Sequence, residues 1–80
     1  MNTLVKEIIA KRLLELRGNK SRQEVAHAVG ISVSALQMYE NAQRIPRDPI
    51  KIRLANYYGI SVQELFYTFT SNNSSDYFTA

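Results

Sequence analysis

Four uncharged side chains recur at a spacing that places them on one face of a helix. They are Val33, Ser34, Gln37 and Met38, and residues three and four positions apart are neighbours on a helix surface. A helix face that serves only solubility normally carries Lys and Glu. Amide and hydroxyl groups instead hydrogen-bond the edges of nucleic-acid bases, while apolar side chains pack on thymine methyl groups. This face therefore favours base reading over a purely solvent-facing role.

Side chains suited to binding phosphate stand on both sides of this face. Arginine can donate several hydrogen bonds to a phosphate, and the N–H groups at a helix N-terminus favour an anion. Each residue alone could equally be a solvated surface residue, but the placement of the set on both sides of one helix favours phosphate contact. Such contacts position a protein without reading sequence. The candidates are Ser21, Arg22, Ser32, Asn41, Gln43, Arg44 and Arg47.

The pattern of apolar residues predicts two short helices around a tight turn at this point of the chain. Val25 and Val29 form the i, i+4 stripe of one helix, and Leu36 and Tyr39 form the i, i+3 stripe of the next. Gly30 lies between them and can adopt the left-handed conformation that turns the chain sharply. Two helices joined in this way form a helix-turn-helix, which presents its second helix to the major groove of DNA.

Further motifs follow in a fixed order along the chain. These are LxxLRG, SRQEVAHAVGIS, YENAQRIPRD, LANYYGIS and ELF, and they run from Leu13 to Phe66, about two thirds of the sequence. In this the chain resembles the helix-turn-helix transcriptional regulators of the phage-repressor type, also called the Cro or xenobiotic-response-element type. The resemblance implies an all-α, compact five-helix repressor-like DNA-binding domain with the helix-turn-helix at helices 2 and 3.

The resemblance also points to a structural ion pair between Arg17 and Glu40. Glu40 is expected near the C-terminal end of the third helix, where the helix dipole disfavours a negative charge, and Arg17 occupies the position that pairs with this glutamate in similar proteins. Two positions depart from the pattern. Ala42 stands where similar sequences usually have glycine, and Arg22 stands where many have a phosphate-contacting glutamine.

Helical spacing and capping signals predict five helices. Ser21 with Glu24 and Ser61 with Glu64 are S-x-x-E capping boxes, while Pro49 suits the first position of a helix. The predicted helices extend from about Leu4 to Arg17, from the cap Ser21 to Gly30, from the cap Ser32 to about Asn41, from the cap Asp48 to Gly59, and onward from the cap Ser61.

Residues 1–66 are expected to form the DNA-binding domain and residues 67–80 a C-terminal tail. The tail alternates aromatic residues with threonine at positions 67–70 and then becomes polar, so it is either a short strand or disordered. Apolar side chains around the domain boundary exceed what a short terminal helix needs for its own packing, which predicts a dimer interface. The predicted interface residues are Val62, Phe66, Tyr67 and Phe69.

Length, charge and composition restrict the class of protein. Eighty residues form one small domain, and all ten basic but only six of the seven acidic residues fall in residues 1–66, giving that part a net charge of +4. The chain has no cysteine, and its single histidine, His27, is expected on the surface, so no metal site is predicted. No cofactor, small-molecule ligand or catalytic constellation is expected. No signal peptide or membrane-spanning run is found, which predicts a cytoplasmic protein.

Two hypotheses for the function follow. The first is a sequence-specific regulator of transcription that acts as a repressor and binds double-stranded DNA as a homodimer to a two-fold operator. The alternative is a small helical protein-interaction module, similar to an antitoxin or an anti-repressor, that keeps the fold without reading the groove. The polar face of the third helix, with Arg22, Arg44 and Arg47 around it, favours the first.

Overall fold

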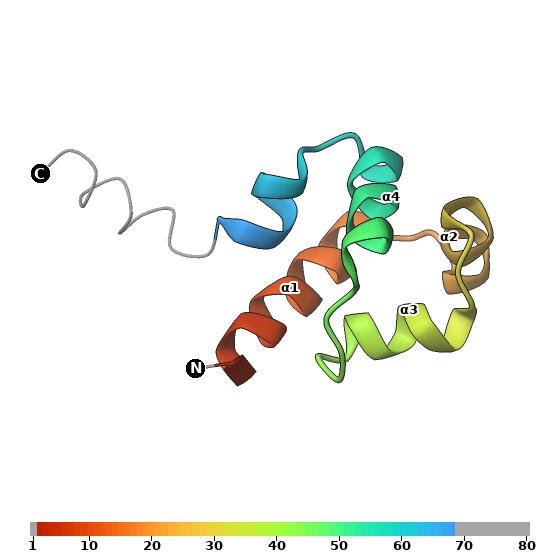
Figure 1. Cartoon of the computed structure of the whole chain (residues 1–80). Helices are drawn as coiled ribbons and strands as arrows, with labels where there is room; N and C mark the ends of the chain where they lie inside the picture. Colours follow the sequence, from red (N-terminus) through yellow and green to blue (C-terminus); the bar gives the residue numbers. More distant parts are fainter. Residues whose placement is uncertain (1, 69–80) are drawn as a thin grey trace, which may run out of the picture.

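Within residues 2–68, four α-helices and one short π-helical turn surround a single apolar core (Figure 1). The computed structural model describes residues 2–68, and no strand occurs in this part of the chain. The prediction of an all-α fold with five helices is confirmed. The elements are α1 (Asn2–Arg17), α2 (Arg22–Val29), α3 (Val33–Glu40), α4 (Asp48–Tyr58) and η1 (Gln63–Tyr67).

The longest helix, α1, is the element on which the others are assembled. It contacts both α3 and η1, while α2 contacts α3 and α4. In Figure 1, α2 and α3 lie together at the right of the molecule, and η1 lies above α1 toward the left. The helix-turn-helix segment therefore forms one end of the described structure.

The core takes fully buried side chains from every element. Leu13 of α1, Leu36 of α3 and Leu54 of α4 have no exposed surface, and Val25 of α2 and Phe66 of η1 complete the set. Burial of one such side chain contributes roughly 1.5–3 kcal/mol. Because Leu36 is anchored in this core, the inner face of α3 is fixed and its opposite face is directed to solvent.

The serine caps predicted for α2 and α3 are both present. Ser21 Oγ accepts a hydrogen bond from the Glu24 N–H at 3.0 Å, and Ser32 Oγ accepts one from the Ala35 N–H, also at 3.0 Å. Each bond satisfies one of the N–H groups that a helix leaves unpaired in its first turn. The two helices of the helix-turn-helix thus begin at the residues that the sequence indicates.

The start of α4 differs from the prediction by one residue. Arg47, not Asp48, is the N-cap, and its side chain makes no capping hydrogen bond. The reason lies in the backbone, because the Lys51 N–H donates to the Arg47 carbonyl at 2.9 Å and so makes Arg47 the first residue of the helical ladder. Asp48 instead lies in the first turn, where its carboxylate is 3.7 Å from Lys51 Nζ and interacts favourably with the helix dipole.

The last described element, η1, is held by contacts at both ends. The Glu64 N–H donates to Ser61 Oγ at 3.0 Å and the Ser61 N–H donates to the Glu64 carboxylate at 3.3 Å, which confirms the predicted capping box. Arg12 of α1 donates to the backbone carbonyls of Glu64 and Leu65, at 3.0 and 3.1 Å, and to that of Thr68. These contacts fasten the turn to α1.

Two residues of this segment lie elsewhere than the sequence suggested. Tyr67 is helical and does not begin a strand. Phe66 is only 1 % exposed, because the π-helical turn directs both Leu65 and Phe66 into the core, so it offers no accessible surface to a dimer partner. Residues 69–80 of the predicted tail, Phe69 among them, lie outside the described residues. The domain boundary at residue 66 stays a prediction.

Residues 2–68 contain neither a membrane-spanning helix nor a cluster of metal ligands. No helix there is long and apolar enough to cross a membrane, and no three His, Cys, Asp or Glu side chains gather in a way that could hold a metal ion. His27 is exposed on α2.

Candidate nucleic-acid interface

The turn between α2 and α3 is built on Gly30. Its φ of 84° and ψ of 35° lie in the left-handed region that favours glycine. The N–H groups of Gly30 and Ile31 both donate to the Ala26 carbonyl, at 2.8 and 3.0 Å, which closes the end of α2. Since α3 already begins at Val33, the two helices are joined by the short turn of a helix-turn-helix.

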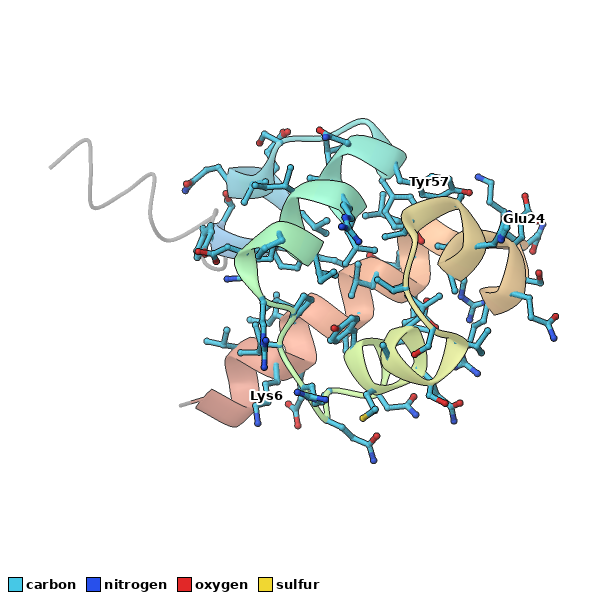
Figure 2. The ribbon with its side chains drawn as sticks, turned by 45° about the vertical axis from the view of Figure 1, so that its right-hand side comes forward. Lys6, Glu24 and Tyr57 are labelled. Carbon is cyan, nitrogen blue, oxygen red and sulfur yellow. The ribbon has the colours of Figure 1, made fainter. Side chains whose placement is uncertain are left out.

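The outer face of α3 contains the four residues predicted to read bases. Val33, Ser34 and Gln37 are exposed, Val33 by 39 %, and Met38 is half-buried. The one charged residue of α3, Glu40, is buried, so this face carries no charge. Figure 2 shows side chains of α3 projecting from the side of the molecule away from α4.

The residues predicted to bind phosphate lie around this face. The hydrogen bond between Arg22 Nε and Glu40 brings the start of α2 beside the end of α3. The hydroxyls of Ser21 and Ser32 accept capping hydrogen bonds, which leaves the hydroxyl hydrogen of each as a donor. Of the seven predicted residues, Arg22 is half-buried and the other six are exposed: Ser21, Ser32, Asn41, Gln43, Arg44 and Arg47.

Glu40 is the buried charge at the centre of this region. Arg17 Nε donates to Glu40 Oε2 and Arg22 Nε donates to Glu40 Oε1, both at 2.8 Å. The Glu40 side chain has no exposed surface. A buried carboxylate is costly unless it is paired and hydrogen-bonded, and here two guanidinium groups satisfy it. The pair expected between Arg17 and Glu40 is present. The contact of Arg22 was not predicted, because Arg22 and Glu40 are 18 positions apart in the sequence and no local spacing rule relates them.

The charges of the same cluster affect the pKa of Tyr58 on α4. Burial, followed by the negative charge of Glu40, raises the pKa of the Tyr58 hydroxyl to about 12, and the positive charge of Arg17 partly opposes this shift. The hydroxyl is buried and has no hydrogen-bond partner among residues 2–68. Tyr58 is therefore neutral at physiological pH. The ring of its neighbour Tyr57 meets it edge-on, with ring centres 5.0 Å apart.

The other side of α2 is bounded by Tyr57, which Figure 2 labels at the end of α4. Lys20 Nζ lies 5.9 Å from the centre of the Tyr57 ring, a distance at which a cation interacts with an aromatic face. Glu24 points outward from α2 in the same view. The cationic Lys20 is thus held just before the first residue of α2.

The end of α3 is shaped by Ala42. It is the one non-glycine residue among the described residues with a positive φ, 62°. The N–H groups of Gln43 and Arg44 donate back to the Met38 carbonyl, at 2.9 and 3.3 Å, which is the reversal that usually ends on glycine. The loop that carries the exposed Arg44 therefore leaves α3 in the glycine-like geometry despite the alanine.

The predicted dimer residues are not equivalent. Val62 is half-buried against the core, Phe66 belongs to the core, and Tyr67 is 47 % exposed. The Tyr67 hydroxyl is 2.7 Å from Lys51 Nζ, which also lies 4.7 Å from the centre of the Tyr67 ring. Among the predicted dimer residues that the structure describes, only Tyr67 thus presents a large accessible apolar surface.

Comparison with known proteins agrees with this geometry. A family model described as helix-turn-helix matches residues 11–65, a range that contains the complete helix-turn-helix, the Glu40 cluster and α4. No curated protein and no solved structure match the chain. The matched range covers more than half of the 80 residues, and the chain therefore belongs to the helix-turn-helix family of DNA-binding regulators, of the phage-repressor or Cro/C1 type.

Proposed function

We propose that this protein is a sequence-specific repressor of transcription that binds duplex DNA as a homodimer. The observation that carries the proposal is the exposed, uncharged face of α3, which is followed directly by the exposed cations Arg44 and Arg47. A polar face with flanking arginines suits a polyanion whose base edges are read. The protein would act in the cytoplasm on the DNA that it regulates, and the proposal includes no catalytic step, cofactor or small-molecule ligand.

In this proposal α3 enters the major groove and four side chains read bases. Gln37 and Ser34 hydrogen-bond base edges, because their amide and hydroxyl groups match the donors and acceptors there. Val33 and Met38 pack on thymine methyl groups. The half-burial of Met38 restricts its contact to the part of the side chain that reaches the surface.

The flanking residues contact the backbone, and the dimer sets the spacing. Ser21, Arg22 and Ser32 would approach phosphates on one side of α3, while Asn41, Gln43, Arg44 and Arg47 would do so on the other. One recognition helix per subunit gives two half-sites about one helical turn, roughly 34 Å, apart. Tyr67 and Val62 remain candidates for the two-fold contact.

The proposal is tested by selecting binding sites from randomised duplex DNA and comparing two variants on selected and random duplexes. Gln37→Ala should cost on the order of 1–3 kcal/mol at the selected site and little on random DNA, since it removes a base contact. Arg44→Ala should weaken binding to both. It should also flatten the slope of log affinity against log salt by about two units for a symmetric dimer.

Lys11→Ala provides the matched control, because Lys11 is an exposed cation on α1 outside the proposed interface. Equal weakening of selected and random DNA by Gln37→Ala would show that α3 does not read bases there. A folded protein that binds no duplex and yields no selected site would instead support a protein-interaction module.

A further inference from the structure

The two arginines that hold Glu40 differ in what else they contact. Arg17 donates through Nε to Glu40 and through Nη1 to the Lys20 carbonyl at 2.8 Å, and its side chain is 18 % exposed. Arg22 donates to Glu40 through Nε, and its side chain is 34 % exposed. Within residues 2–68 no further hydrogen bond of Arg22 is found. Arg17 thus donates to two acceptors within the protein, whereas the terminal amino groups of Arg22 can donate to another acceptor.

A guanidinium group can serve two acceptors at once because its N–H groups form a rigid planar fork. The hydrogen bond from Arg22 Nε to the buried Glu40 carboxylate, which Arg17 also holds, fixes the plane of that fork. Its terminal N–H groups are then preorganised for a phosphate oxygen, with which guanidinium forms strong, charge-assisted hydrogen bonds.

The charges of the cluster agree with this arrangement. Arg17 and Glu40 compensate each other, and Arg22 gives the three side chains a net charge of +1. Without Arg22 an approaching phosphate would meet a neutral pair that contains a buried carboxylate. With Arg22 in place, the more exposed guanidinium lies at the surface of the cluster while the carboxylate has no accessible surface.

We propose that Glu40 is a positioning residue for DNA binding, whose buried carboxylate holds Arg22 by Nε so that the terminal amino groups of the same guanidinium bind a DNA phosphate. This rests on the proposed function and adds a coupling between a buried carboxylate and the DNA backbone. It assigns different roles to the two arginines, since Arg17 stabilises the fold and Arg22 links the fold to the ligand.

The test is a double-mutant cycle on the affinity of the full chain for a short random-sequence duplex over a series of salt concentrations. The variants are Arg22→Gln, Glu40→Gln and the double variant, with Lys11→Gln as the control for loss of one surface cation and thermal unfolding as the check of folding. Glu40→Gln removes a negative charge, which by net charge alone should strengthen DNA binding. If Glu40 positions Arg22, affinity should instead fall, by about tenfold for one charge-assisted hydrogen bond lost.

The coupling distinguishes positioning from a general loss of structure. Glu40→Gln should weaken binding in the wild-type background and have little effect when Arg22 is already Gln. The slope of log affinity against log salt should be flatter than in the Lys11→Gln control only in the variants that change or release Arg22. Equal effects of Glu40→Gln in both backgrounds would overturn the positioning role.

A second variant keeps the test decisive if Glu40→Gln does not fold. Arg22→Lys keeps the charge but replaces the planar fork by a point charge, so it should bind DNA more weakly than the wild-type protein. Wild-type affinity of Arg22→Lys would overturn the proposal, because charge alone would then suffice. Salt-dependent binding by the wild-type chain without coupling between Arg22 and Glu40 would refute this inference alone, whereas absence of duplex binding would refute the proposed function as well.

Discussion

The hydroxyl of Tyr58 is buried near Glu40 and has no hydrogen-bond partner among residues 2–68. A buried polar group without a partner has lost its hydrogen bond to water and gained none in return. The ring itself packs against the core, so the tyrosine contributes through its apolar part. Its hydroxyl opposes folding and makes stability sensitive to alkaline pH.

Tyr58→Phe should therefore stabilise the protein, by about 1 kcal/mol at neutral pH, because it removes the unpaired hydroxyl and keeps the ring. The pKa of Tyr58 is raised from 10.0 to about 12 by folding, so the unfolded chain releases this proton first as pH rises. Stability linked to Tyr58 is fully present below pH 10 and is lost as pH rises through about 12. Urea unfolding at neutral pH and above pH 10 measures both effects.

Tyr57→Phe is the matched control, since it removes a hydroxyl from the adjacent ring. Among residues 2–68 the Tyr57 hydroxyl is not a buried oxygen without a hydrogen-bond partner. A destabilised Tyr58→Phe protein with an unchanged alkaline transition would indicate that the hydroxyl has a partner such as water.

How far the sequence predicts side-chain contacts depends on whether a local rule governs them. Ser21 and Ser32 were predictable as caps because a cap and its N–H partner are three positions apart. The contact of Arg17 with Glu40 was expected from resemblance to a family, not from spacing. The contact of Arg22 with the same carboxylate arises only when α2 crosses α3, and no pattern within either helix indicates it.

Among the helices, the end of α3 contains a residue whose type does not suit its backbone conformation. Ala42 adopts a φ of 62°, although a residue with a Cβ atom is disfavoured there by roughly 1–2 kcal/mol. The backbone hydrogen bonds of Gln43 and Arg44 to Met38 hold the turn in this conformation. The exit of α3 directs the loop of the proposed phosphate contacts, so its geometry bears on function as well as on stability.

Ala42→Gly should stabilise the protein, by about 1 kcal/mol, because glycine adopts the left-handed conformation without a steric cost. The greater freedom of glycine in the unfolded chain reduces part of this gain. Ala28→Gly is the matched control, as Ala28 is an exposed residue inside α2 where glycine should cost up to about 1 kcal/mol. Chemical denaturation of the two variants should give shifts of opposite sign, and shifts of the same sign would contradict the strain assigned to Ala42.

The termini of elements were predicted well where a capping residue marks them and poorly where tertiary contacts decide them. The start of η1 follows from Ser61 and Glu64, a local signal. Its continuation through Tyr67 depends on Arg12 of α1, more than fifty positions away, which donates to the carbonyls of the turn. The alternation that suggested a strand after Phe66 carries no information about that contact.

At the scale of the whole molecule, a two-fold dimer requires one surface that contacts a copy of itself. Phe66 is buried in the core and has almost no exposed surface to contribute to it. A truncation after Leu65 would therefore remove a core residue and is unsuitable as a test of dimerisation. Tyr67, exposed and held against α4 by Lys51, is the described residue on which the proposed interface now depends.

Tyr67→Glu should convert the protein into a folded monomer, because it would place two like charges against each other across the two-fold axis and remove the apolar ring. Sedimentation measures the association, and the monomer should bind a full two-fold site more weakly than the wild-type protein while single half-sites are bound with similar affinity. Ile52→Glu is the control, since Ile52 is 52 % exposed on α4 and outside the proposed interface. Loss of the dimer in Ile52→Glu with its retention in Tyr67→Glu would move the interface from η1 to α4, where the same exposed apolar surface would meet its copy.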